Sequence, residues 1–187
     1  MQLKINLPNL LVVLRILLIP VFLLFFLSGE AGAGENQSFR MLALVVFLIA
    51  AVSDFFDGYL ARKWKTVSNF GKLMDPLADK MLVSAAMIAL AYTQELPAWV
   101  VVVIICREFW VTSLRMLALE QGRRVISASL WGKIKTVLQM AMIIVFLADM
   151  AMLNRLWIPE ILMYLAIITT VLSAVEYTKD YKDVFIA

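Results

Sequence analysis

The sequence predicts an all-α polytopic membrane protein, with six transmembrane helices and a short N-terminal interfacial segment. Hydrophobic residues make up 63% of its 187 residues and charged residues only 17%, whereas a soluble domain carries about 25% charged residues. The apolar residues gather in runs close to the roughly 20 residues that cross a hydrocarbon core. No internal repeat or low-complexity segment divides the chain, so we expect a single membrane domain over residues 1–187.

Six apolar runs separated by short polar stretches are the predicted spans. Residues 1–9 precede them, and we predict that this segment lies at the interface and contains a turn at Leu7-Pro8-Asn9. No convincing small-residue cleavage site comes directly after the first run, which we therefore expect to be a retained span and not a signal peptide. The predicted spans cover residues 10–27, 41–60, 76–92, 98–119, 134–148 and 157–175.

The basic residues predict the orientation in the membrane, because cytoplasmic loops carry the excess of Lys and Arg. The loops that follow the second and fourth spans hold most of them, while the opposite loops hold only Arg40 and Arg155. Both termini are then predicted to be cytoplasmic. The loop residues on that side are Arg62, Lys63, Lys65, Lys72, Arg123, Arg124 and Lys133.

The chain contains no histidine, and its single cysteine is Cys106. These counts exclude an intrachain disulfide, zinc sites built on imidazole, and Ser-His or Cys-His catalytic pairs. Any acid–base chemistry therefore falls to carboxylates, lysines or tyrosines.

Four aspartates near the end of the second span and the start of the third are the first candidate site. Asp54 and Asp57 are three residues apart and Asp75 and Asp79 four apart, so each pair shares one face of a helix. Four carboxylates brought together need a cation, and Mg²⁺ prefers such oxygen ligands together with substrate phosphates. The pattern predicts a metal site for a phosphorylated substrate.

The same residues also have simpler interpretations. Asp75 before Pro76 fits a helix start, where aspartate caps and proline occupies the first turn. Asp54 and Asp57 fit a solvated helix end, although the apolar residues around them make ionisable groups costly there. Gly58 and Ala61 would let a ligand approach the backbone, or serve as small residues in helix packing.

Basic residues of the fourth and fifth spans form the second candidate site. Arg107 and Arg115 lie on roughly one face of a helix, and Lys133 and Lys135 open the fifth span. Arginine suits bidentate contacts with phosphate, so the four cations predict a phosphate pocket. The alternative for the lysines is the cytoplasmic excess of basic residues or binding of anionic lipid.

The order of the aspartates resembles the signature Asp-x2-Asp-Gly-x2-Ala-Arg-x8-Gly-x3-Asp-x3-Asp of the CDP-alcohol phosphotransferase family. Eight fixed positions at fixed spacing make this a specific pattern. Motifs around Arg15, Arg107-Glu108-Phe109, Ser113-Leu114-Arg115 and Gly132–Gln139 are most similar to the family members that use glycerol 3-phosphate. The signature residues here are Asp54, Asp57, Gly58, Ala61, Arg62, Gly71, Asp75 and Asp79.

The resemblance implies a homodimer with a polar cavity open to the cytoplasm, in a bacterial inner membrane. It implies that Asp54, Asp57, Asp75 and Asp79 bind Mg²⁺ or Mn²⁺ and that Asp79 is the catalytic base. It further implies that the CDP group is bound by Asp54, Asp57, Gly58, Ala61, Arg62 and Gly71.

The activity that the resemblance implies is transfer of a phosphatidyl group from CDP-diacylglycerol to sn-glycerol 3-phosphate. Arg107, Arg115, Lys133 and Lys135 would hold the acceptor's phosphate. The expected partners are these substrates and membrane lipids, with no nucleic acid. Serine, inositol phosphate or phosphatidylglycerol remain alternative acceptors, and a cation transporter or a structural scaffold are alternatives outside the enzyme class.

Overall fold

The computed structural model describes residues 7–30, 37–64, 69–121, 129–149 and 155–182, and within these it leaves the side chains of 7–12, 30, 54–64, 69–76, 79 and 119 undescribed. The described residues form helices joined by short connections and contain no strand. The long helices are α1 (Leu7–Glu30), α2 (Gln37–Trp64), α3 (Asn69–Tyr92), α4 (Ala98–Glu120), α5 (Leu130–Ala148) and α7 (Ile158–Asp180).

Each predicted span falls on one of these helices, apart from Trp157, which precedes the first residue of α7. The helices run beyond the apolar segments at most ends, and α2 continues through Arg62 to Trp64. Hydropathy marks only the part of a helix that suits an apolar environment. The helix itself can continue into polar sequence, because its backbone hydrogen bonds do not depend on apolar side chains. The all-α prediction is therefore confirmed for the described residues.

Two predicted helix starts are wrong. Helix α3 begins at Asn69, so Asp75 and Pro76 lie inside it and Asp75 is not its cap. The helix begins more than one turn before the proline, because residues outside the apolar run can also form helical backbone hydrogen bonds. Leu7, Pro8 and Asn9 form the first turn of α1 and not a separate turn, with Pro8 near the start, where its missing N–H is not needed.

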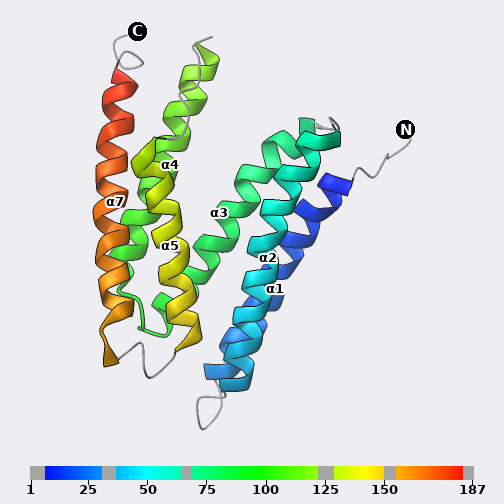
Figure 1. Cartoon of the computed structure of the whole chain (residues 1–187), viewed down its shortest axis with the longest axis vertical. Helices are drawn as coiled ribbons and strands as arrows, with labels where there is room; N and C mark the ends of the chain where they lie inside the picture. Colours follow the sequence, from blue (N-terminus) through cyan, green and yellow to red (C-terminus); the bar gives the residue numbers. More distant parts are fainter. Residues whose placement is uncertain (1–6, 31–36, 65–68, 122–128, 150–154, 183–187) are drawn as a thin grey trace. The chain divides into compact units, whose positions relative to one another are not determined.

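The chain divides into two compact units, Met1–Thr93 and Gln94–Ala187. In the first unit, α1 packs against both α2 and α3, and consecutive helices run antiparallel (Figure 1). Its core includes an aromatic cluster in which the Phe22 ring lies 5.9 Å from that of Phe26 and 6.0 Å from that of Phe47, measured between centroids. Ala43 and Ala50 are fully buried on α2, and such small residues let helices approach closely.

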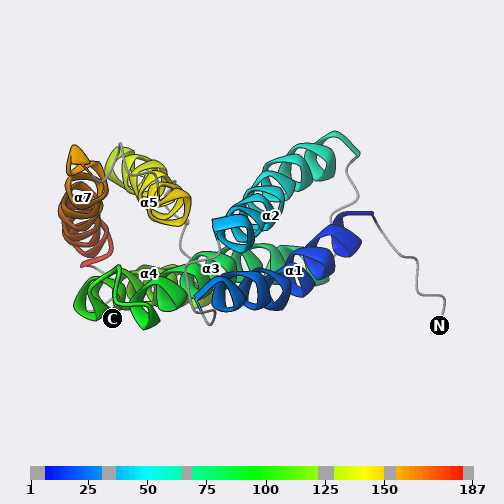
Figure 2. The ribbon, with the colours of Figure 1, turned by 90° about the horizontal axis from the view of Figure 1, so that it is seen from below.

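In the second unit, α7 packs against both α4 and α5. Figure 2 shows these three helices from below. Helices α4 and α7 run in the same direction, and α5 runs antiparallel to them (Figure 1). A cluster of buried side chains joins the C-terminal halves of α4 and α7 and comprises Val111, Leu114, Ala118, Tyr177 and Tyr181.

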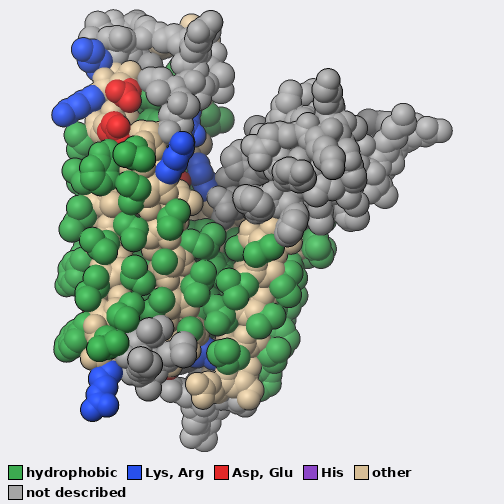
Figure 3. Space-filling view, viewed as in Figure 1, with side chains coloured by type: hydrophobic (Ala, Val, Ile, Leu, Met, Phe, Trp, Pro, Cys, Tyr) green, Lys and Arg blue, Asp and Glu red, His purple; other side chains and the backbone are tan. Residues whose placement is uncertain are grey.

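Large apolar side chains are exposed on all six long helices. Leu24 is 67% exposed, Phe109 69% and Val137 68%. Hydrophobic side chains cover most of the visible face of α5 and α7, while charged ones gather near the C-terminal end of α7 (Figure 3). Among the described residues, α5 and α7 are long and apolar enough to cross a membrane. An apolar surface of this extent suits a lipid environment.

Candidate functional site

The signature residues lie on two consecutive helices of the first unit. Asp54, Asp57, Gly58, Ala61 and Arg62 are in the C-terminal part of α2, and Gly71, Asp75 and Asp79 are in the first half of α3. Because these helices are antiparallel neighbours, the two halves of the signature are at the same end of the unit (Figure 1). The side chains of all eight lie outside the described residues, so their roles stay predictions.

The chemistry of the four aspartates fits a hard divalent cation. The helical backbone keeps Asp54 with Asp57, and Asp75 with Asp79, on shared helix faces. Carboxylate oxygens are the ligands that Mg²⁺ and Mn²⁺ take. Among the residues with described side chains, no group of three or more His, Cys, Asp or Glu forms a metal site.

In the second unit, three of the four predicted phosphate-binding residues come together. Lys135 Nζ and Arg107 Nη1 both donate to Oε1 of Glu108, the second at 3.2 Å. The Arg107 and Lys135 side chains are 9% and 5% exposed. Two cations from α4 and α5 therefore converge, nearly buried, on one carboxylate oxygen.

Tyr177 of α7 joins Arg115 to this group. Arg115 Nη2 donates to the Tyr177 hydroxyl at 2.6 Å, and the backbone N–H of Ser129 donates to the same oxygen at 3.2 Å. The guanidinium carbons of Arg115 and Arg107 lie 5.1 and 5.6 Å from the centroid of the Tyr177 ring, within cation–π range. Arg107, Glu108, Arg115, Lys135, Ser173 and Tyr177 are named here the cationic cluster.

Both arginines of the cluster keep a buried donor without a partner. Arg107 Nη2 donates to the Ser173 hydroxyl, yet the Nε atoms of Arg107 and Arg115 have no hydrogen-bond partner among the described residues. A buried N–H without a partner is costly, and an anion that accepts from it removes the cost. The cluster therefore has the charge and the unused donors of an anion site.

Lys133 differs from the other three predicted residues. It is exposed, and its side chain makes no hydrogen bond or ion pair with the described residues. Residues two apart in a helix point in directions about 200° apart, so Lys133 and Lys135 lie on different faces of α5. A phosphate contact from Lys133 stays a prediction.

The start of α5 lies in close contact with α7. The Ser129 hydroxyl accepts from the Gly132 backbone N–H at 3.1 Å and caps the helix. A Cβ at Gly132 would lie 3.5 Å from Tyr177 Cε2 and 3.6 Å from Ser173 Oγ, so the backbone of α5 passes close to these side chains. This approach brings Ser129 within reach of the Tyr177 hydroxyl.

The sequence alone did not predict that Ser173 or Tyr177 belongs to the site. Glu108 was noted only as the residue next to Arg107. A usable signal was present in α7, where Thr169, Ser173 and Tyr177 recur every fourth residue along a largely apolar helix. All three are buried. Polar residues on one face of an apolar helix indicate an interior polar site.

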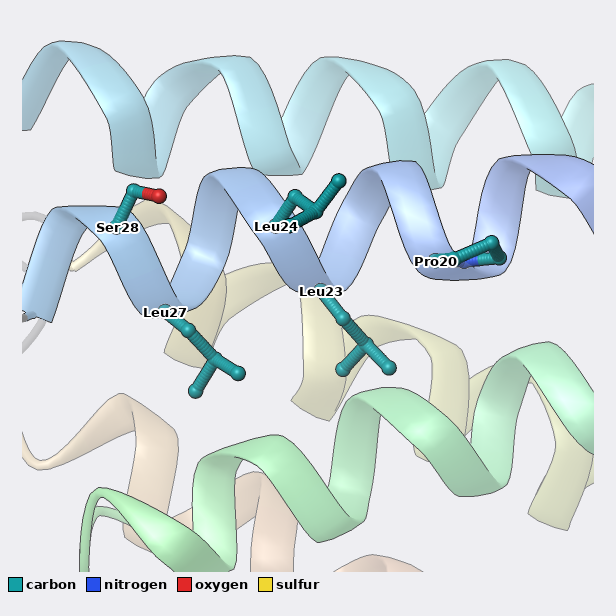
Figure 4. A pocket seen from close by; sticks show the side chains of 5 residues that line it. All are labelled: Pro20, Leu23, Leu24, Leu27 and Ser28. Atoms are coloured by element: carbon teal, nitrogen blue, oxygen red, sulfur yellow. The ribbon is translucent and has the colours of Figure 1, made fainter.

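A groove on α1 offers no comparable chemistry. It is lined by four apolar side chains and one hydroxyl, all from that helix, and Leu23 and Leu27 point to the same side (Figure 4). Its described lining contains no charged residue, so it offers a phosphorylated substrate less than the cationic cluster does. The lining residues are Pro20, Leu23, Leu24, Leu27 and Ser28.

Comparison with known proteins places the chain in one family. The family model described as CDP-alcohol phosphatidyltransferase matches residues 5–172. A Bacillus subtilis protein named CDP-diacylglycerol–glycerol-3-phosphate 3-phosphatidyltransferase is 40% identical, over 92% of this chain and 93% of its own length. A Haemophilus influenzae protein with the same name is 35% identical, over 96% of this chain and 95% of its own.

A third relative, from Mycobacterium tuberculosis, is named a probable phosphatidylglycerophosphate synthase and is 39% identical over 92% of this chain and 79% of its own length. The family match includes the aspartate signature on α2 and α3 and the four cluster residues on α4 and α5, whereas Ser173 and Tyr177 of α7 lie just beyond it. With a family model over most of its length and relatives at this identity, the chain belongs to the CDP-alcohol phosphatidyltransferase family.

Proposed function

We propose that this protein transfers the phosphatidyl group of CDP-diacylglycerol to sn-glycerol 3-phosphate, with phosphatidylglycerophosphate and CMP as products. The names of the relatives from B. subtilis and H. influenzae support the reaction. The observation that supports a phosphorylated acceptor is the convergence of Arg107, Arg115 and Lys135 in the cationic cluster. These cations suit a phosphorylated alcohol better than serine, which has no phosphate to bind.

The donor is bound by the signature residues in this proposal. Gly58, Ala61 and Gly71 leave room beside the helix backbone for the CDP group, and Arg62 contacts its phosphates. A divalent ion, Mg²⁺ or Mn²⁺, bound by Asp54, Asp57, Asp75 and Asp79 supplies positive charge to the diphosphate.

The transfer itself is an in-line displacement at phosphorus. Asp79 accepts the proton of the acceptor's primary hydroxyl as that oxygen attacks the phosphorus bearing the diacylglycerol. The bond from this phosphorus to the bridging oxygen breaks, and CMP leaves with the electron pair. Arg62 stabilises the charge on the phosphoryl oxygens.

The acceptor is held by its phosphate in the cationic cluster. The free donors of Arg107 and Arg115 and the ammonium group of Lys135 bind the phosphate oxygens, with Lys133 as a further contact. Fixing the phosphate restricts the positions open to the attacking hydroxyl, which lowers the entropy cost of the reaction.

The protein works in a membrane in this proposal, with six spans and with both termini and the active site facing the cytoplasm. The exposed apolar side chains of the six helices support the location, because the acyl chains of the donor can then remain in lipid. A bacterial inner membrane and a homodimer are expectations from the family resemblance.

An acceptor screen tests the proposal. Purified protein is supplied with labelled CDP-diacylglycerol, a divalent cation and one acceptor at a time, and both CMP and the lipid product are measured. We expect turnover with sn-glycerol 3-phosphate and little with serine, inositol phosphate or phosphatidylglycerol. Faster turnover with another acceptor would reassign the substrate, and cation flux in proteoliposomes without CDP-lipid would support a transporter.

A further inference from the structure

Glu108 is the one carboxylate among the six residues of the cationic cluster. Its Oε1 accepts from Lys135 Nζ of α5 and from Arg107 Nη1 of α4. Both donors are nearly buried, whereas the Glu108 side chain is 20% exposed. One anion thus holds two cations from two helices at a single point.

Two buried cations repel each other and would separate or bend away without an anion between them. Each side chain has many other rotamers open to it, because lysine and arginine are long and flexible. A carboxylate that accepts hydrogen bonds from both cations favours one arrangement of the two side chains. It also keeps the two groups adjacent before any substrate arrives.

We propose that Glu108 is a positioning residue of the acceptor site, which holds Lys135 and Arg107 in the arrangement that receives a phosphomonoester. The inference rests on the proposed function, since it takes the cationic cluster as the acceptor's phosphate site. Glu108 does not touch the reacting atoms. It acts through Lys135 and Arg107, and its loss weakens acceptor binding while donor binding and the chemical step persist.

The first test is Glu108→Gln, which keeps an oxygen that accepts hydrogen bonds but removes the charge. We expect the KM for sn-glycerol 3-phosphate to rise about tenfold, as for loss of a charge-assisted hydrogen bond. The KM for CDP-diacylglycerol and kcat should stay within about twofold of wild type. Glu108→Asp keeps the charge on a shorter side chain and should give an intermediate KM.

Glu120→Gln is the matched control. Glu120 is an exposed carboxylate on the same helix, α4, and its neutralisation should leave both KM values unchanged. Thermal unfolding in detergent shows whether each variant is folded. If Glu108→Gln does not fold, the Asp variant decides, since a selective rise in the acceptor's KM supports the proposal and an unchanged KM overturns it.

A double-mutant cycle with Lys135→Gln separates positioning from an independent effect. If Glu108 acts through Lys135, the double variant should lose little more acceptor affinity than Lys135→Gln alone. Additive losses would overturn the proposal, as would equal rises in the KM of both substrates. A lower acceptor KM in Glu108→Gln would also overturn it, because Glu108 would then compete with the phosphate.

The wild-type assay distinguishes this inference from the proposed function. If wild type makes no phosphatidylglycerophosphate from sn-glycerol 3-phosphate, the proposed function fails. If wild type does so and Glu108→Gln has an unchanged acceptor KM, the positioning role alone fails.

Discussion

Arg115 shows at the scale of one residue how the cationic cluster is assembled. It lies on α4, eight residues after Arg107, and its donor reaches Tyr177, which is 62 positions away in the chain. The contact of both guanidinium groups with the same aromatic ring agrees with the prediction that they share a face of the helix. The position of that ring could not be predicted, because helical spacing says nothing about which helix packs opposite.

Replacement of Arg115 by Ala should raise the KM for sn-glycerol 3-phosphate by about 10- to 100-fold, the loss expected for charge-assisted bonds to phosphate. The KM for CDP-diacylglycerol should change little. Steady-state kinetics with each substrate varied in turn measures the difference. Arg155→Ala removes an exposed arginine outside the cluster and serves as the control. Equal rises in both KM values would argue against an acceptor pocket.

Replacement of Asp79 by Asn should lower kcat by about 10²- to 10⁴-fold, because the amide cannot take the proton from the acceptor hydroxyl. Binding of CDP-diacylglycerol should persist. Release of CMP and equilibrium binding of the donor are the two measurements, with Asp180→Asn, on α7, as the control. Full turnover in Asp79→Asn would remove this residue as the base.

At the scale of helices, the start of α5 matters most for the site. Ser129 caps the helix through its side chain and donates its backbone N–H to Tyr177, so one residue fixes the end of α5 and its contact with α7. Apolar runs in the sequence predicted the body of each helix well. The ends were harder to place, as the starts of α3 at Asn69 and of α1 at Leu7 show, because a helix can extend beyond its continuous apolar part.

Replacement of Ser129 by Ala should destabilise the protein by about 1 kcal/mol, since the Gly132 N–H loses its acceptor. For a chain of this size, that loss lowers the midpoint of thermal unfolding by about 2–4 °C. Thermal unfolding in detergent measures it. Ser113→Ala, at an exposed position within α4, is the control and should change the midpoint little. An unchanged midpoint in Ser129→Ala would mean that the cap contributes nothing measurable.

At the scale of the molecule, the proposed chemistry depends on a divalent cation bound by the signature aspartates. Exhaustive chelation of the purified protein should abolish CMP release, and added Mg²⁺ or Mn²⁺ should restore it. A cation that binds only the folded state should also raise the thermal midpoint of wild type, and this rise should be lost when Asp54 and Asp57 are both replaced by Asn. CMP release that persists at full rate after chelation would contradict the metal site.

The sequence by itself determined the all-α class, the helix-bearing segments and the family, because apolar runs and signature spacing are properties of neighbouring residues. Only the tertiary structure decided that Glu108 bridges Arg107 to Lys135 and that Ser173 and Tyr177 complete the cluster. Apart from the adjacent Arg107 and Glu108, these partners lie 27 to 66 positions apart in the chain. Their contacts depend on how side chains of α4, α5 and α7 pack, and no local pattern in the sequence encodes that packing.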